Sequence, residues 1–310
     1  MKVKYSILAP AYNEQEVLKQ FYDELTKHMD TLKEEYEIVF VNDGSKDNTY
    51  LILKELARKD KRVKVVNFSR NFGQQAAEFA ALKYATGEAV IIMDCDLQDP
   101  PEVALQMIEK WKEGYEVVHG KRKKRKGETV FKKLTAHVYY RFLRKITGMD
   151  IPTDTGEFKL YDRKVVDAIL ALPEHNRYLR ALATWVGFRQ TSISFDRPNR
   201  SAGVTKWTVK KMIRLAEDGI LANSAYPLAL ALKCGLFLAF SSLITFIVFI
   251  VLAILEIGLP LVAWLFPTVA LLAGIVLIMQ GFSNLYIGRI YDEVKGRPNY
   301  IVSDTINIKE

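Results

Sequence analysis

The 310-residue sequence has few cysteines and lacks the common nucleotide-binding loops. Cys95 stands between two aspartates and Cys234 in an apolar segment, so we expect no disulfide and a reducing compartment. No Gly-x-Gly-x-x-Gly or Walker A pattern occurs, which weighs against a dinucleotide site and an ATP phosphate loop. The apolar stretch after the charged N-terminus breaks at Asn13. It is too short for a signal peptide and is typical of a first strand.

Positive charge dominates the first part of the chain. The formal net charge is +8, and the charges after Tyr226 balance, so the whole excess lies in residues 1–226. A basic surface favours a polyanionic partner such as nucleic acid, an anionic membrane or a phosphorylated substrate. The densest cluster is the basic run 121–126, which has no interleaved aromatic residue. We therefore expect no nucleic acid and favour a loop that gathers a lipid-linked phosphate, with a solvated loop as the alternative.

Residues 4–120 alternate short apolar runs with amphipathic segments, which predicts βαβ units and an α/β fold with a mostly parallel sheet. The expected strands are 5–9, 37–41, 63–68, 89–93 and 116–119, and the expected helices are about 14–30, 48–59, 74–86 and 101–112. Beyond them, 128–185 looks mainly helical, with a break at 148–156, before a strand at 188–195.

Two carboxylates one residue apart, Asp94 and Asp96, follow the fourth apolar run. In open α/β sheets, ligands bind outside the carboxyl ends of the strands. Carboxylate oxygens suit Mg²⁺ or Mn²⁺, which are usually held by one or two carboxylates together with substrate phosphates. The alternative is that these aspartates cap a turn or the next helix. Asp99, just before Pro100 and Pro101, can take that capping position, which favours a metal site at the other two.

Two long uncharged stretches, 235–255 and 257–288, lie toward the end of the chain. Each is long enough to cross a bilayer of about 30 Å at about 1.5 Å per residue. We therefore expect a two-span hairpin in the cytoplasmic membrane, with the N-terminal domain and both termini on the cytoplasmic side. Buried helices of a large domain are the alternative. Residues 206–221 predict an amphipathic helix in the membrane interface, with a core helix as the alternative.

Six short motifs occur in order along the chain: Pro10-Ala11-Tyr12-Asn13-Glu14, Val41-Asn42-Asp43-Gly44-Ser45, Arg70-Asn71-Phe72-Gly73, Asp94-Cys95-Asp96-Leu97-Gln98-Asp99, Asp154-Thr155-Gly156-Glu157-Phe158 and Gly203-Val204-Thr205-Lys206-Trp207. Together they resemble the family 2 inverting glycosyltransferases of the dolichol-phosphate-mannose-synthase type. The nearest branch is the bacterial polyprenyl-phosphate (bactoprenol) glucosyltransferases, which have a tail similar to 288–298. The resemblance covers nearly the whole chain.

The resemblance implies a GT-A (Rossmann-like) fold and an inverting transfer of a hexose from a UDP-sugar to polyprenyl (undecaprenyl) phosphate, with Mg²⁺ or Mn²⁺. Glucose is the expected hexose, and cell-envelope glycosylation the expected use. The residues that would bind the donor nucleotide-sugar are Pro10, Tyr12, Glu14, Asp43, Arg70, Asp94 and Gln98. The implied metal ligands are Asp94 and Asp96, and the implied catalytic residues are Asp96 and Glu157. The implied ligands of the acceptor phosphate are Arg122, Arg200 and Lys206.

Two positions depart from the family pattern. Glu157 stands where the family typically has Asp, and Cys95 where it has a small residue such as Ala. The longer Glu157 side chain leaves three roles open: a base, a ligand of the sugar or a structural group. We expect Cys95 to point away from the metal, because alternate strand residues face opposite sides.

Other functions remain as alternatives. The same reaction with N-acetylglucosamine or galactose is open. A processive polysaccharide synthase would carry a Gln-x-x-Arg-Trp motif, which is absent. A non-catalytic, membrane-anchored nucleotide-binding protein is the alternative from another class. Expected partners are the UDP-sugar, polyprenyl phosphate and the lipid bilayer, with a homo-oligomer left open. The expected domains are a catalytic domain at 1–205, an amphipathic helix at 206–226, a transmembrane hairpin at 227–290 and a cytoplasmic tail at 291–310.

Overall fold

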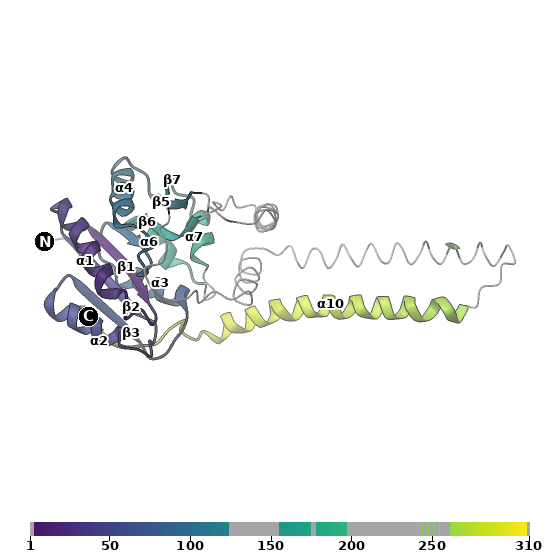
Figure 1. Cartoon of the computed structure of the whole chain (residues 1–310). Helices are drawn as coiled ribbons and strands as arrows, with labels where there is room; N and C mark the ends of the chain where they lie inside the picture. Colours follow the sequence, from purple (N-terminus) through teal and green to yellow (C-terminus); the bar gives the residue numbers. More distant parts are fainter. Residues whose placement is uncertain are drawn as a thin grey trace. The chain divides into compact units, whose positions relative to one another are not determined.

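The structure is a computed structural model that describes residues 3–123, 155–174, 178–196 and 261–308, with five single positions between 244 and 254. The chain divides into two compact units, one formed by 1–215 with 298–310 and the other by 216–297. The first unit contains a mixed β-sheet with helices on both faces (Figure 1).

The described part of the first unit has eight strands in the order β7-β5-β6-β4-β1-β2-β3-β8. Strands β1 to β4 run parallel to one another, whereas β6 and β8 run antiparallel to their neighbours. The strands are β1 (Tyr5–Ala11), β2 (Tyr36–Asn42), β3 (Val63–Phe68), β4 (Ala89–Ile92), β5 (Val117–Arg122), β6 (Thr155–Asp162), β7 (Gln190–Phe195) and β8 (Val302–Ile306).

The direction in which strands are added reverses at β1, which pairs with β2 on one side and with β4 on the other. Ligands of open α/β sheets bind in the crevice at such a point, outside the carboxyl ends of the strands. Strand β6 runs antiparallel to β4, so it begins at the edge where β4 ends. Because Ile92 pairs with Lys159, residue 157 lies two residues beyond the end of β4, at the same edge of the sheet.

Two hydrophobic cores fill the two faces of the sheet. Alternate residues of β1 divide between them: Ile7 faces one core and Leu8 the other, as the two-residue period of a strand requires. The helices over the first face are α1 (Leu18–Met29), α2 (Thr49–Lys59) and α4 (Pro101–Lys112). Those over the second face are α3 (Gln74–Tyr84), α6 (Arg163–Ala171) and α7 (Leu179–Trp185) (Figure 1).

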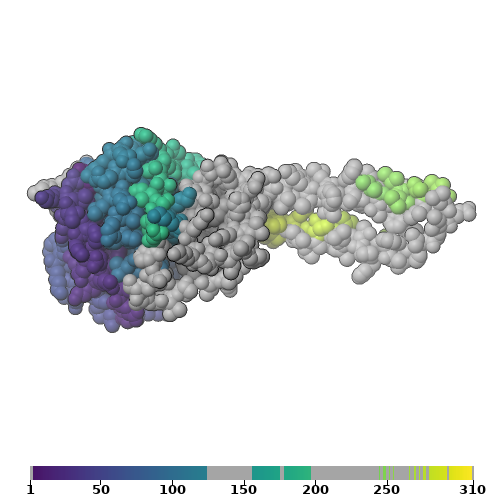
Figure 2. Space-filling model, turned by 45° about the horizontal axis from the view of Figure 1, so that its top comes forward, coloured from purple at the N-terminus to yellow at the C-terminus, as the bar shows by residue number. Residues whose placement is uncertain are grey.

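Helix α1 shows why these segments form amphipathic helices. Its buried residues are Leu18, Phe21, Leu25 and Met29, which recur at the spacing of one helical face. This face packs on the sheet and against α4, and the two helices form adjoining purple and blue surfaces in Figure 2.

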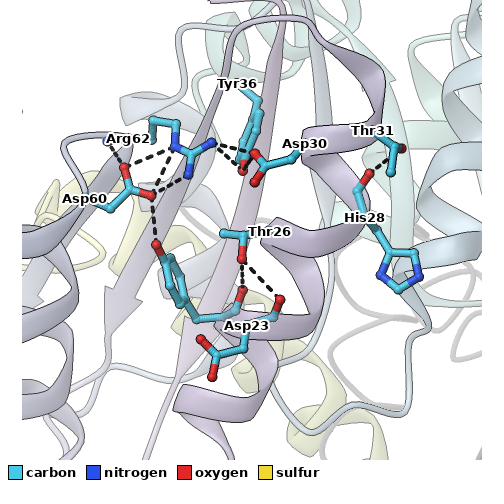
Figure 3. Close-up of polar contacts among 9 residues, drawn as sticks. Asp23, Thr26, His28, Asp30, Thr31, Tyr36, Asp60 and Arg62 are labelled. Carbon is cyan, nitrogen blue, oxygen red and sulfur yellow. Dashed lines mark hydrogen bonds and ion pairs between the residues drawn. The ribbon is translucent and has the colours of Figure 1, made fainter.

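Arg62 ties together three elements at the amino edge of the sheet (Figure 3). Its Nη2 donates to Asp60 Oδ2 at 2.8 Å, and its Nη1 donates to Asp30 Oδ1 and to the Tyr36 hydroxyl oxygen, each at 2.7 Å. Tyr22 of α1 donates to the same Asp60 carboxylate at 2.8 Å. This network joins the end of α1, the start of β2 and the start of β3, and it lies at the edge opposite to the carboxyl ends of the parallel strands.

The predicted α/β fold is confirmed, and each strand expected before residue 120 is present. The expectation of mainly helical structure over 128–185 is wrong at 155–162, which forms β6. The missed signal is a two-residue period: Phe158 and Leu160 face one core, and Tyr161 faces the other. Strand β8 was also missed, because only five residues form it and the polar Ser303, Asp304 and Thr305 interrupt its apolar pattern.

In the parts of the chain that the structure describes, no helix is both long and apolar enough to cross a membrane. This finding contradicts the expected two-span protein and its expected localisation. Helix α10 (Leu261–Lys295) covers much of the second expected span. The expectation rested on the absence of charge, but α10 also carries uncharged polar groups. Gln280 Nε2, for example, donates to Asn284 Oδ1 at 3.1 Å.

Several expectations fall outside the described residues. They are the amphipathic helix at 206–226, nearly all of the first uncharged stretch, Cys234, and the basic run beyond Lys123. The expected tail, 291–310, begins inside α10, which continues to Lys295, and it includes β8 of the first unit.

Candidate active site

The carboxyl edge of the sheet gathers most of the residues that the motifs single out. Each predicted group lies at or just after the carboxyl end of a strand, or at the start of the antiparallel β6, so the topology brings them to one edge. The residues are Pro10, Tyr12 and Glu14 at β1, Asp43 at β2, Arg70 after β3, Asp94, Asp96 and Gln98 after β4, Arg122 at the end of β5, and Glu157 at the start of β6.

The loop after β1 is bonded to the loop after β2. The amide of Asn13 donates to Ser45 Oγ at 3.0 Å, and the amide of Lys46 donates to Asn13 Oδ1 at 2.8 Å. The amide of Glu14 donates to Thr49 Oγ1 at 2.8 Å. Asn13 has a positive φ of 55°, a conformation that Asn adopts more readily than most residues. These bonds hold the loops after β1 and β2 together at the carboxyl edge of the sheet.

Asp43 is 4% exposed and anchors the loop after β3. Its Oδ1 accepts from the amide of Phe72 at 2.7 Å, and its Oδ2 accepts from the amide of Gly73 at 3.0 Å and from Asn71 Nδ2 at 2.8 Å. Burial raises the pKa of Asp43, and the two amides partly oppose this rise. Arg70 lies in the same loop, with its guanidinium 4.0 Å from the centre of the Phe72 ring.

Gly44 allows the two loops to approach each other. A Cβ at this position would lie 2.3 Å from the carbonyl carbon of Arg70 and 2.5 Å from the nitrogen of Asn71. Its φ of 62° is also in the region that favours glycine. The Gly44 in the Asp43-Gly44-Ser45 motif is therefore required by close backbone packing beside Asp43.

The paired carboxylates lie on a tight turn after β4. The amide of Gln98 donates to Asp96 Oδ1 at 3.1 Å, and Asp96 is 7% exposed. Leu97 has a positive φ of 59°, which is uncommon for such a side chain and marks a constrained backbone. Gln74, the first residue of α3, approaches Asp94, with Nε2 3.4 Å from its Oδ1.

Asp99 does not have the expected capping position. The N-cap of α4 is Pro100, and Asp99 Oδ2 instead accepts from the amide of Asp94 at 3.1 Å. The turn at Leu97 brings Asp99 back to the end of β4, where it is 1% exposed. It thereby supports the backbone of the Asp94-Cys95-Asp96 turn.

Cys95 lies in the core, as the alternation of side chains predicts. It is 2% exposed, and its Sγ lies 3.5 Å from the carbonyl oxygen of Pro10. Burial raises the pKa of the Cys95 thiol well above its usual range. A neutral, buried thiol does not compete with the neighbouring carboxylates for a hard cation.

Glu157 lies among positive charges. Arg180 Nη2 donates to Glu157 Oε1 at 2.8 Å, and Lys159 Nζ lies 4.0 Å from Oε2. Burial alone would raise the pKa of the Glu157 carboxyl, but the charges of Arg180, Lys159 and Arg122 hold it below its usual range. Glu157 is therefore an ionised carboxylate at neutral pH.

Arg122 approaches the same carboxylate from β5. Its Nη2 lies so close to Gly156 that a Cβ on the glycine would be 2.6 Å away. The predicted acceptor-phosphate ligand Arg122 thus lies at the start of β6, beside Glu157. The other two predicted ligands, Arg200 and Lys206, lie outside the described residues.

A buried glutamate, Glu78, and a buried lysine, Lys159, interact electrostatically with Glu157. Glu78 of α3 is fully buried, and its Oε2 accepts from Gln75 Nε2 at 3.0 Å. Burial, and then the negative charges of Glu157 and Asp94, raise the pKa of Glu78 well above its usual range. Burial lowers the pKa of Lys159 to about 8.

His119 of β5 belongs to the same group. Its Nε2 lies 2.8 Å from Gln190 Oε1, and burial lowers its pKa to about 4. His119 is therefore neutral at pH 7, and it adds no charge to the site.

The motifs did not identify Glu78, Lys159, Arg180 or Asn71 as site residues. The available signal for Glu78 was a carboxylate among the alanines and Phe79 of α3. Glutamate is almost never fully buried unless it is paired, so a glutamate on a buried helix face indicates a partner or a function. Lys159 and Arg180 could not be assigned from spacing, because β6 and α7 come together only through the fold.

The paired carboxylates fit a divalent cation. Among the described residues there is no group of three His, Cys, Asp or Glu that could hold a metal alone. Asp94 and Asp96 supply two hard oxygen donors, and Mg²⁺ or Mn²⁺ commonly takes its remaining ligands from water and a substrate diphosphate. The donor set therefore suits a cation that arrives together with a phosphorylated substrate.

The sequence model described as "Glycosyl transferase family 2" matches residues 6–170, more than half of the chain and nearly all of the described site. The chain belongs to glycosyltransferase family 2. This glycosyltransferase is 48% identical over 309 residues to the "Uncharacterized glycosyltransferase YkcC" of Bacillus subtilis (strain 168), covering 99% of this chain and 95% of that one. It is 39% identical over 302 residues to the "SfII prophage-derived bactoprenol glucosyl transferase" of Shigella flexneri, covering 97% of each.

The fold of the glycosyltransferase is of the GT-A-like, Rossmann type with a mixed sheet. A mycobacterial protein of known crystal structure shares this fold with a TM-score of 0.50 and 16% identity, over 71% of this chain and 73% of that one. The expectation of a family 2 glycosyltransferase is confirmed.

Proposed function

We propose that this glycosyltransferase transfers a glucosyl group from UDP-glucose to polyprenyl phosphate, with inversion at the anomeric carbon. The observation that carries the proposal is the convergence of Asp94, Asp96 and Glu157 at one edge of the sheet. The acceptor and the sugar are supported by relatives named bactoprenol glucosyl transferase, which are 37–39% identical over nearly the whole chain.

The donor nucleotide would bind across the loops after β1, β2 and β3. Pro10, Tyr12, Glu14 and Asp43 would contact the base and ribose, and Arg70 and Gln98 would lie toward the diphosphate. The supporting observation is the rigid loop around Asp43, where three donors from residues 71–73 bond its carboxylate. A prearranged loop lowers the entropic cost of binding.

Asp94 and Asp96 would hold Mg²⁺ or Mn²⁺ on the donor diphosphate. When bound, such an ion would neutralise charge on the departing nucleoside diphosphate. The chain's own contribution is to fix the two carboxylates: Gln98 bonds the Asp96 side chain, and Asp99 bonds the backbone of Asp94. Asp96 is the catalytic residue of this pair in our proposal.

Glu157 would accept a hydrogen bond from a sugar hydroxyl rather than remove a proton. The nucleophile, a phosphate oxygen, is already anionic at neutral pH, so a strong base is not needed. The ion pair with Arg180 also lowers the basicity of the carboxylate. Arg122, with Arg200 and Lys206, would attract the acceptor phosphate and orient it for in-line attack.

Purified protein with undecaprenyl phosphate in detergent and a panel of labelled UDP-sugars tests the proposal. We expect a lipid-linked product from UDP-glucose that depends on Mg²⁺ or Mn²⁺, with a β linkage by NMR. Transfer from UDP-N-acetylglucosamine or UDP-galactose instead would change the sugar but retain the reaction. Nucleotide binding without transfer from any donor would support a non-catalytic binding protein and refute the proposal.

A further inference from the structure

The end of the chain completes the sheet that carries the donor site. The C-terminal segment, residues 300–307, contains β8, which pairs antiparallel with β3 at the outer edge of the sheet. The paired residues are Val65 with Ile306, Val66 with Thr305, Asn67 with Asp304 and Phe68 with Val302. The segment belongs to the same compact unit as the site.

Side chains fasten the far end of the C-terminal segment to α2 and β3. Asn307 Nδ2 donates to the carbonyl oxygens of Ala57 at 2.7 Å and Val63 at 2.8 Å. The Tyr50 hydroxyl donates to Asp304. The two Asn307 bonds satisfy backbone acceptors at the end of α2 and the start of β3, so the segment is an integral part of the folded domain.

The near end of the segment contacts the loop that surrounds Asp43. The ring of Tyr300 stacks on that of Phe68, with centres 4.9 Å apart and planes at 14°. The ring of Phe68 meets that of Phe72 edge-to-face at 5.7 Å and 88°. The amide of Ser69 donates to the carbonyl oxygen of Ile301 at 3.0 Å.

The three rings in contact are those of Tyr300, Phe68 and Phe72, and the last of these residues also binds the Asp43 carboxylate. The backbone amide of Phe72 donates to Asp43 Oδ1 at 2.7 Å, and the guanidinium of Arg70 lies over the Phe72 ring. The register between β3 and β8 shifts between Asn67 and Phe68, immediately before this loop. A bulge at the end of a strand re-aims the residues that follow it.

We propose that Tyr300 is a positioning residue for the donor: through Phe68 and Phe72 it holds loop 70–73, and hence Asp43, in the geometry that binds a nucleoside diphosphate. The proposal rests on the proposed function for its assignment of Asp43 to the donor nucleotide. It assigns Tyr300 to the support of the donor site, although this residue lies more than 200 residues beyond Asp94.

The test compares Tyr300→Ala with Tyr300→Phe in the full chain. Tyr300→Ala should weaken UDP binding in calorimetry about two- to tenfold, the effect of losing an aromatic pair. It should also speed hydrogen exchange at the amides of Phe72 and Gly73. Tyr300→Phe retains the ring and should change both values less than Tyr300→Ala does. Tyr291→Ala, at a 59% exposed tyrosine of α10, is the control and should change neither value.

Hydrogen exchange without nucleotide separates this proposal from the proposed function. If wild-type protein binds no UDP, the donor assignment fails, and the exchange rates still decide whether Tyr300 holds the loop. Unchanged exchange in Tyr300→Ala would overturn the positioning role. Faster exchange with unchanged UDP affinity would overturn the link to the donor. If Tyr300→Ala does not fold, Tyr300→Leu keeps an apolar side chain and removes the stacking.

Discussion

Arg180 donates a hydrogen bond from Nη2 to Glu157 Oε1 at 2.8 Å and joins α7 to the first residues of β6. Both side chains are largely buried, with exposed fractions of 15% for Arg180 and 12% for Glu157. A buried carboxylate needs such a partner to remain ionised. The pair therefore determines the charge of the carboxylate at residue 157, which lies at the same edge of the sheet as the paired aspartates.

Replacing Arg180 with Ala should leave Glu157 buried without its closest cation. We expect the variant to lose about 3–5 kcal/mol of stability at neutral pH, as for other broken buried pairs. Transfer should fall as the pKa of Glu157 rises. Urea unfolding and initial rates measure the two effects. Lys112→Ala, which removes an exposed ion pair with Glu109, should change stability by less than about 1 kcal/mol.

The same pair predicts a pH dependence. The folded pKa of Glu157 is below its ordinary value, so the stabilisation by Arg180 is present above pH about 4.5. It is lost as the pH falls through the lowered pKa. The difference in unfolding free energy between wild type and Arg180→Ala should therefore shrink in acid. A constant difference from pH 7 to pH 3 would contradict this role.

Substitution of the paired carboxylates should affect catalysis through the metal. Asp96→Ala should reduce transfer by more than about 100-fold, since even changes around metal ligands cost about 10–100-fold. Asp99→Asn, which weakens support for the turn at Asp94, should have a smaller effect. EDTA should stop the wild-type reaction, and added Mg²⁺ or Mn²⁺ should restore it. Glu102→Ala, on the exposed first turn of α4, is the matched control.

Substitutions at two glycines with positive φ allow the cost of backbone strain to be measured separately from the cost of steric overlap. Gly44→Ala and Gly114→Ala should each cost about 1–2 kcal/mol for the left-handed conformation. Gly44→Ala should cost about 1–3 kcal/mol more, because its Cβ would overlap the backbone of Arg70. At Gly114 the nearest atom is Arg189 Nη1, at 3.8 Å. Equal losses in thermal unfolding would show that the loops at Gly44 can separate freely.

The Arg62 network should contribute to stability without affecting catalysis. Arg62→Ala removes bonds to Asp60 and Asp30 and the contact of the guanidinium with the Tyr36 ring at 4.6 Å. Because the Arg62 side chain is 37% exposed, solvent screening limits the expected loss to about 1 kcal/mol. The kcat and KM for transfer should equal those of wild type below the unfolding temperature. A changed KM would show that this edge communicates with the site.

The local elements of the first unit were predictable because their patterns are local. The alternation of Ile7 and Leu8 between two cores and the spacing of Leu18, Phe21 and Leu25 are properties of short segments. The motif residues after β1, β2 and β4 could be placed at one edge, because parallel strands have their carboxyl ends on the same side. By contrast, β6 and β8 escaped prediction, because the two-residue period of β6 lies in a stretch interpreted as mainly helical, and the five residues of β8 include three consecutive polar ones.

The sequence by itself determined the βαβ order, the paired aspartates and the family to which the chain belongs, since these follow from residue types at short spacing. Only the tertiary structure decided which side chains surround them. It showed that Asp99 supports Asp94 rather than capping α4, that Arg180 and Lys159 flank Glu157, and that Tyr300 stacks on Phe68. Such contacts arise where chain segments cross, and their energies depend on distance and burial rather than on spacing along the chain.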